Sequence, residues 1–98
     1  MYDLRFHEDA LQEFLRLDGS VRQHMKVRLA AVQTSPSQSS HPLNGLLTGF
    51  NEIKLLKAGI RAIYRIDVQH QRIDVISIGK RERLQVFAVA LERLADLL

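Results

Sequence analysis

The most concentrated positive charge in the chain falls within four residues. Lys80, Arg81 and Arg83 belong to the segment "VISIGKRERLQVF", in which an apolar run typical of a strand ends at Gly79 and an apolar pattern of a different period begins. Clustered lysine and arginine side chains attract and position anionic groups. The segment therefore predicts a surface for a polyanionic ligand where a strand gives way to a helix.

The distribution of charge along the chain supports the same interpretation. Residues 54–83 hold eight Lys and Arg against three Asp and Glu, a net charge of +5, whereas the whole chain carries only +3. A basic segment on a near-neutral body suggests a polyanionic partner. Charge alone leaves a second interpretation open, a solvated surface whose charges are unevenly spread.

The elements that would position these cations begin with a strand and two helices. Tyr2–Phe6 alternates apolar and charged residues, which is the period of a half-buried strand. Glu8–Leu17 has apolar residues at helical spacing and acids at its N-terminal end. After Gly19, Ser20 is a favourable N-cap for a second helix, whose buried stripe would be Val21, Met25, Leu29 and Val32. We expect the two helices to form a hairpin.

Three strands and a helix complete the predicted order. Ser35–Pro42 is a loop by composition. Three strand-like segments follow, and their short connections favour an antiparallel meander: Phe50–Leu56, Ile60–Val68 and Arg72–Ile78. Leu84–Leu98 repeats apolar residues at spacings of three and four, as an amphipathic helix does. We therefore expect one α+β domain, residues 1–98, with helices packed on one face of the sheet.

The alternation of side chains along a strand assigns the cations to faces. Glu52 and Lys54 share one face, and Arg61 and Arg65 share one face of the next strand, while the opposite face carries the apolar set Ile60, Ala62, Tyr64 and Ile66. The partly open face would then gather Lys54, Arg61 and the cations of residues 80–83. Gly79 is expected to make the sharp turn that aims those cations across the sheet.

Composition excludes several classes of site. The chain has no cysteine, and therefore no disulfide, cysteine-based zinc site or thiol nucleophile. No metal or other cofactor is expected, because the histidines are scattered without metal-ligand spacing: His7, His24, His41 and His70. No run is apolar and long enough to span a membrane, and the first ten residues lack signal-peptide features. We expect no membrane partner and a cytoplasmic location.

Two segments together carry a resemblance to a known family. "NEIKLLKAGIRAIYRIDV" followed by "DVISIGKRERLQVF" resembles the RelE branch of the RelE/ParE toxin superfamily, in which a strand bearing a lysine leads to a G-[YI]-R-x-[IV]-Y strand and then to a V-I-x-[IV]-G-K-R segment. "ALQEFLRLDGSVRQHMKVRL" is similar to the helical hairpin of the same group. The similarity extends over nearly the whole chain and implies the RelE-like α+β fold.

The resemblance implies a function and a set of partners. A RelE-like toxin is paired with a small RelB-like antitoxin, and the complex of the two binds operator DNA. The free toxin enters the A site of the 30S ribosomal subunit and cuts the messenger RNA there without a metal. The 2′-hydroxyl attacks the adjacent phosphate, which leaves a 2′,3′-cyclic phosphate and a free 5′-hydroxyl.

The resemblance also implies roles for individual residues. Lys54 would be a base or a phosphate-positioning group, Arg61 would stabilise the transition state, and Arg81 would contact the scissile phosphate and assist the leaving group. Further contacts to RNA or the ribosome are expected from four cations: Lys57, Arg65, Lys80 and Arg83. Arginine suits such positions because its planar fork can bind a phosphate through two donors.

Two positions depart from the family pattern. Glu52 stands where the family often has a second lysine, and Phe87 stands where it often has tyrosine. Glu52 could itself be the base, or it could be a substitution that weakens the site. Phe87 can stack on a nucleobase, but it has no hydroxyl for proton transfer, and core packing on the last helix explains it equally well.

Other interpretations remain open at this point. Arg61 and Arg65 are also consistent with the ordinary polar face of a half-exposed strand, and Lys57 and Lys80 with solvated surface positions. At the level of function, the same fold could serve a ParE-like protein that poisons DNA gyrase, or a ribosome-binding relative that has lost catalysis. The phosphate-binding cluster at Lys54, Arg61 and the "GKRER" turn favours the nuclease.

Overall fold

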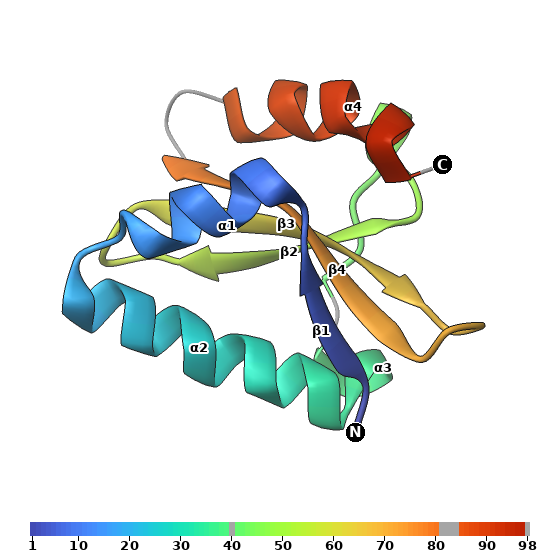
Figure 1. Cartoon of the computed structure of the whole chain (residues 1–98), viewed down its shortest axis with the longest axis horizontal. Helices are drawn as coiled ribbons and strands as arrows, with labels where there is room; N and C mark the ends of the chain where they lie inside the picture. The colour runs from blue at the N-terminus through green and yellow to red at the C-terminus, as the bar shows by residue number, and fades with distance from the viewer. Residues whose placement is uncertain (40, 81–84, 98) are drawn as a thin grey trace.

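A four-stranded sheet lies at the centre of the computed structural model, which describes residues 1–39, 41–80 and 85–97 (Figure 1). In chain order the strands are β1 (Asp3–Phe6), β2 (Phe50–Leu55), β3 (Ile60–Asp67) and β4 (Arg72–Lys80). Across the sheet their order is β1-β4-β3-β2, with β1 parallel to β4 and the other neighbours antiparallel. The predicted N-terminal strand and meander are confirmed.

The helices also follow the predicted order. They are α1 (Glu8–Leu15), α2 (Gly19–Thr34), α3 (Pro36–Ser39), the 3-10 helix η1 (Gly45–Leu47) and α4 (Gln85–Leu97). The hairpin of α1 and α2 is present, but the N-cap of α2 is Asp18 and not the predicted Ser20. The predicted loop contains one turn of helix, α3, which begins at Pro36 because the fixed φ of proline suits a first helical position. None of the described helices is long and apolar enough to cross a membrane.

The larger core lies between the sheet and the α1–α2 hairpin. Buried residues of both helices, among them Phe14, Met25 and Leu29, pack against the predicted apolar face of β3 and its neighbours on β2 and β4. Tyr64 is at the centre of this layer, with no exposed surface. Burial raises the pKa of Tyr64 to about 12, and its hydroxyl donates to the Ser39 carbonyl at 3.4 Å.

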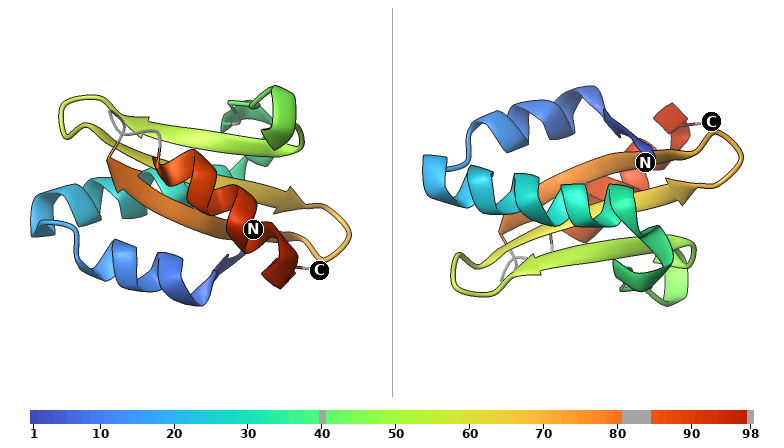
Figure 2. Two further views of the ribbon diagram at one scale, coloured as in Figure 1. Left: turned by 90° about the horizontal axis from the view of Figure 1, so that it is seen from above. Right: turned by 90° about the horizontal axis from the view of Figure 1, so that it is seen from below.

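The opposite face of the sheet is covered in part by α4, so the expectation of helices on one face only is wrong. Val86 and Ala90 of α4 form a second core with Ile63, Ile76 and Phe50 of the sheet. Figure 1 shows α2 and α4 on opposite sides of the sheet, and in Figure 2 α4 lies along β3 and β4. These isoleucines give the second face an apolar patch that a helix must cover.

A β-bulge brings two consecutive residues of β4 to the side that α4 covers. The β3–β4 register shifts between Ile63, which pairs with Ser77, and Tyr64, which pairs with Val75. Ile76 and Ser77 both serve the α4 side, because Ile76 packs in the second core and the Ser77 hydroxyl donates to the Val86 carbonyl at 2.7 Å. An extra residue that re-aims side chains in this way is typical of a bulge.

Side chains form hydrogen bonds with the backbone of β4 along the part of its edge that the short strand β1 does not cover. The Glu13 carboxylate of α1 accepts the Ile78 N–H at 3.0 Å, and Arg93 of α4 donates to the Ile76 carbonyl at 2.8 Å. Arg93 also donates to both Glu13 oxygens, and these hydrogen bonds raise its pKa. A second link joins His7 to Asp96 at 2.6 Å. Through these contacts α4 is held against α1 and the sheet.

Candidate active site

Lys54 and Arg61 lie directly opposite each other on adjacent strands. They are paired in the antiparallel β2–β3 ladder, whose tight turn is closed by Gly59 at a φ of +66°. Glu52 is two residues before Lys54, and its carboxylate contacts both cations. Lys54 Nζ is 3.5 Å from Glu52 Oε1, and Arg61 Nη1 is 3.1 Å from Glu52 Oε2. The predicted gathering of these three residues on one face is thus present.

Phe87 of α4 completes this group of residues. The guanidinium carbon of Arg61 lies 4.9 Å from the centre of the Phe87 ring, within cation–π range. The same ring packs against the second core beside Val86 and Ala90. Phe87 therefore packs in the second core, which is one of the two alternatives, and its ring also contacts the cationic group. Its stacking on a nucleobase stays a prediction.

The group has one carboxylate for two cations, and its hydrogen bonds are incomplete. The Lys54 side chain is 44% exposed, whereas those of Arg61 and Glu52 are 14% and 9% exposed. Among the residues that the structure describes, the buried atoms Arg61 Nε and Glu52 Oε2 have no hydrogen-bond partner. Buried polar atoms are normally paired. Two cations that share one carboxylate, one of them an exposed lysine, form a group that can bind an anionic oxygen.

Gly79 lies across from Arg61 and does not make the predicted sharp turn. It is inside β4, which continues to Lys80, and it pairs with Arg61 in the ladder. A Cβ added at Gly79 would meet Val86 at 3.5 Å, an ordinary contact, so packing does not require glycine there. The consequence of glycine is that β4 places no side chain opposite Arg61, whose cross-strand neighbour on the other side is Lys54.

No protein-family model matches the sequence. Individual relatives do match it over almost its full length. The chain is 37% identical over 93 residues to the mRNA interferase toxin RelE of Escherichia coli K12, which covers 95% of this chain and 97% of the relative. The mRNA interferase RelE of Shigella flexneri matches to the same extent.

The chain belongs to the RelE toxin family.

Solved structures of RelE confirm the family fold. A free double mutant of E. coli RelE superposes with a TM-score of 0.83 at 34% identity, and the match covers 95% of this chain and 97% of that one. RelE in the E. coli RelBE toxin–antitoxin complex gives a TM-score of 0.77 at 36% identity, over 85% of this chain and all of that one. The RelE-like α+β fold predicted from the sequence is therefore confirmed.

The remaining residues predicted for the RelE site lie elsewhere or outside the described part of the chain. Arg81 and Arg83 fall in residues 81–84, which the structure does not describe. Lys80 is exposed at the end of β4 and pairs with Ile60, so its side chain lies on the α1–α2 side, in a groove with Arg16. The structure thus does not bring Lys80 to the group around Arg61, and its contact with RNA remains a prediction.

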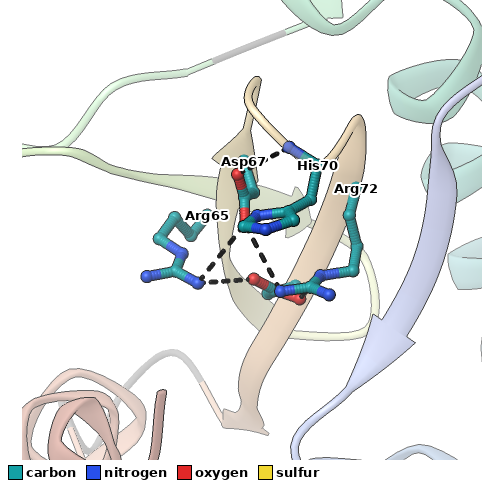
Figure 3. Close-up of polar contacts among 5 residues, drawn as sticks. Arg65, Asp67, His70 and Arg72 are labelled. Atoms are coloured by element: carbon teal, nitrogen blue, oxygen red, sulfur yellow. Dashed lines mark hydrogen bonds and ion pairs between the residues drawn. The ribbon is translucent and has the colours of Figure 1, made fainter. Parts of the chain in front are cut away.

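Arg65 belongs to a separate cluster of charged residues. It donates to Asp74 at 2.8 Å, and Arg72 donates to both Asp74 and Asp67 at 3.0 and 3.3 Å. His70 in the β3–β4 turn contacts Asp67 through its backbone and its ring (Figure 3). We call these five residues the β3–β4 ion cluster. The carboxylates of this cluster bind Arg65. The structure does not place Arg65 near Arg61, and its contact with RNA stays a prediction.

Sequence reasoning missed two residues in the groove beside Lys54, Arg28 and His24. Arg28 of α2 donates to the Lys54 carbonyl at 3.3 Å, and Lys57, which was predicted, is exposed in the β2–β3 turn beside it. His24 lines the same groove. A sequence signal did exist, because residues 19–51 contain no Asp or Glu at all.

Proposed function

We propose that this chain is the toxin of a type II toxin–antitoxin pair and cuts messenger RNA in the ribosomal A site. The observation that carries the proposal is the pairing of Lys54 with Arg61 around a single carboxylate, with the Arg61 guanidinium over the Phe87 ring. A phosphodiester supplies the missing negative charge. The family relationship to mRNA interferases supports the same reaction.

The proposed reaction is the one that the resemblance to mRNA interferases implies. The 2′-oxygen of the nucleotide attacks its own 3′-phosphate, a P–O2′ bond forms, and the P–O5′ bond to the next nucleotide breaks. A base takes the proton of the 2′-hydroxyl, and an acid protonates the departing 5′-oxygen. Arg61 stabilises the negative charge that builds on the non-bridging oxygens, because it is preorganised by Glu52 and by the face of Phe87.

Exposure separates the roles of Glu52 and Lys54. Lys54 can reach an RNA strand because nearly half of its side chain is open to solvent. Glu52 is almost buried between the two cations and holds both of them in place. We therefore assign Lys54 to direct contact with the RNA and Glu52 to positioning of Lys54 and Arg61.

The partners of the toxin follow from the same proposal. In the cytoplasm, the toxin meets the 30S A site and messenger RNA, and a RelB-like antitoxin encoded beside it holds it inactive. The E. coli RelBE complex supports this pairing, since its toxin has the same fold as this chain. The toxin–antitoxin complex would bind operator DNA. Arg81 and Arg83, which the sequence places beside α4, would complete the phosphate site.

Primer-extension mapping on programmed ribosomes tests the proposed reaction. Purified toxin should break messenger RNA within the A-site codon, leave 5′-hydroxyl and cyclic phosphate ends, and leave the same RNA intact without ribosomes. Occupancy of the A site without breaks would instead indicate a binding relative that has lost catalysis. Gyrase-dependent DNA breaks with intact messenger RNA would favour the ParE-like function.

Arg81→Ala tests the predicted phosphate contact in cells. We expect the variant to lose growth arrest while the protein remains soluble and folded, because the resemblance places the Arg81 guanidinium group at the scissile phosphate. Growth after induction, together with circular dichroism of the purified variant, provides the measurement. Full toxicity in a folded Arg81→Ala protein would contradict the assignment.

A further inference from the structure

A second cationic groove lies beside the candidate active site, between α2 and the β2–β3 turn. It has a volume of about 530 Å³. Helix α2 contributes Ser20, Val21, His24 and Arg28 to its wall, and the end of β2 with the turn contributes residues 54–58. We call it the α2 groove. None of the predicted site roles uses its α2 wall.

Among the residues that the structure describes, the lining of the α2 groove is positive and contains no acid. Arg28, Lys54 and Lys57 each bring a full positive charge, and His24 adds ring nitrogens. Helix α2 itself carries no Asp or Glu over its 16 residues. Such a one-sided lining is unusual for a protein surface, where both signs are normally interspersed, and it matches a polyanion in charge.

The α2 groove is continuous with the candidate active site through one residue. Lys54 lines the groove and also contacts Glu52 in the group around Arg61. Arg28 donates to the Lys54 carbonyl, which ties α2 to the same point of β2. Because β2 is an edge strand, an extended ligand bound at Arg61 can pass over this edge into the groove.

The lining also suits the chemistry of a single RNA strand. Cations lie on both walls, Arg28 on the helix and Lys57 on the turn, and the His24 ring lies beside Arg28 on the helix wall. Between them the groove has apolar surface, including Leu56, whose exposed fraction is 65%. Nucleic-acid-binding surfaces combine phosphate contacts from cations with apolar contacts to sugars and bases.

We propose that the α2 groove binds the phosphodiester backbone of RNA next to the cleavage position, through His24, Arg28 and Lys57. The proposal rests on the proposed function, because it takes the RNA held at Lys54 and Arg61 as its starting point. Two RNA strands have this chemistry in the A site, the messenger itself and ribosomal RNA. The acid-free lining favours a nucleic acid over a protein segment, which would need acidic residues at matching positions.

Equilibrium binding to ribosomes provides the test, and it is independent of cleavage. Ribosomes carry a messenger with 2′-O-methyl nucleotides in the A site, so that no 2′-hydroxyl can attack. Lys57→Ala and Arg28→Gln should each raise the Kd about fivefold to tenfold at moderate salt. Each should also reduce the slope of log Kd against log salt by about 1, because one phosphate contact is lost. Arg28→Gln keeps an amide donor for the Lys54 carbonyl.

Lys26→Ala is the matched control. Lys26 is exposed on the same helix, but it does not line the α2 groove. Its substitution by alanine removes the same charge as the groove variants do. In the control variant, the Kd should stay within about twofold of the wild-type value, and the salt slope should stay within about 0.3 of it. An equal effect of Lys26→Ala would overturn the proposal, because the net charge would then explain the loss.

Two further arms identify the RNA and the competing occupant. On ribosomes whose messenger ends at the P site, a persistent effect of Lys57→Ala assigns the contact to ribosomal RNA, and its disappearance assigns the contact to the messenger. Unchanged ribosome affinity and salt slope for both groove variants would refute the groove as an RNA site. Weaker binding of the antitoxin in that case would show that a protein segment occupies it.

Discussion

Arg61 and Arg65 lie four residues apart on the same face of β3, yet their surroundings differ. Arg65 is part of the β3–β4 ion cluster, where two arginines face two carboxylates and Asp74 accepts from both. Arg61 shares one carboxylate, Glu52, with Lys54, and it also lies over an aromatic ring. The Nε atom of each arginine lacks a partner, so the difference lies in the number of carboxylates.

This difference separates a structural cluster from a binding site. The ion cluster is close to neutral, and it joins the β3–β4 turn to the start of β4 (Figure 3). The group around Arg61 has an excess positive charge and an open lysine, which cost stability unless an anion binds. An arginine on a strand is therefore informative about function only when its acidic partners are known.

Removing Asp74 should have the largest effect on stability. Its side chain is 2% exposed and accepts from Arg65 and Arg72. Asp74→Ala should lower the free energy of unfolding by about 3 kcal/mol, because a buried charge cluster loses one partner. Urea denaturation measures the loss of stability. Asp74→Asn should retain part of the stability that Asp74→Ala loses. An unchanged midpoint for Asp74→Ala would show that the cluster contributes little.

Glu52→Gln should have a smaller effect and decides how the site works. If Glu52 positions Lys54 and Arg61, the amide keeps the shape of the side chain and single-turnover cleavage should fall by no more than about tenfold. If Glu52 is the base, the loss should be about 100-fold to 10,000-fold. Cleavage at saturating ribosomes distinguishes the two roles.

The pH dependence of stability should show the smallest effect. Hydrogen bonds from the His70 backbone and ring lower the pKa of Asp67 below its ordinary value of 3.8. A lowered folded-state pKa stabilises the fold at pH values above 3.8, and this contribution is lost as the pH falls through the folded-state pKa. Asp67→Asn should therefore be less stable than wild type at pH 6, and the gap should close towards pH 2. A constant gap in thermal unfolding across this range would contradict the assignment.

Local sequence patterns were sufficient to predict most of the fold. Periods of two and of three to four residues predicted the order of strands and helices, and a short turn closed by Gly59 fixes the β2–β3 register. Alternation along those strands then predicted that Lys54, Glu52 and Arg61 share a face. The site could be predicted to this extent because its central pair comes from one hairpin.

Long-range contacts could not be predicted in the same way. The apolar stripe of α4 shows that the helix is half-buried, but only the chain as a whole decides on which face of the sheet it packs. Ile63 and Ile76 on the second face were the available signal. Arg65 resembled Arg61 in sequence because Asp74, its main partner, lies on the neighbouring strand. The bulge at residues 76–77 has no marker in the local pattern.

The central claim is that the group around Arg61 performs the chemistry and the ion cluster does not. Single-turnover cleavage of A-site messenger at saturating ribosomes tests it directly, with Arg61→Ala compared with Arg65→Ala at a temperature where both are folded. We predict a loss of about 100-fold to 1,000-fold for Arg61→Ala, as for the removal of one oxyanion donor, and a rate within about threefold of wild type for Arg65→Ala. Equal losses in the two variants, or an unchanged rate for Arg61→Ala, would contradict the claim.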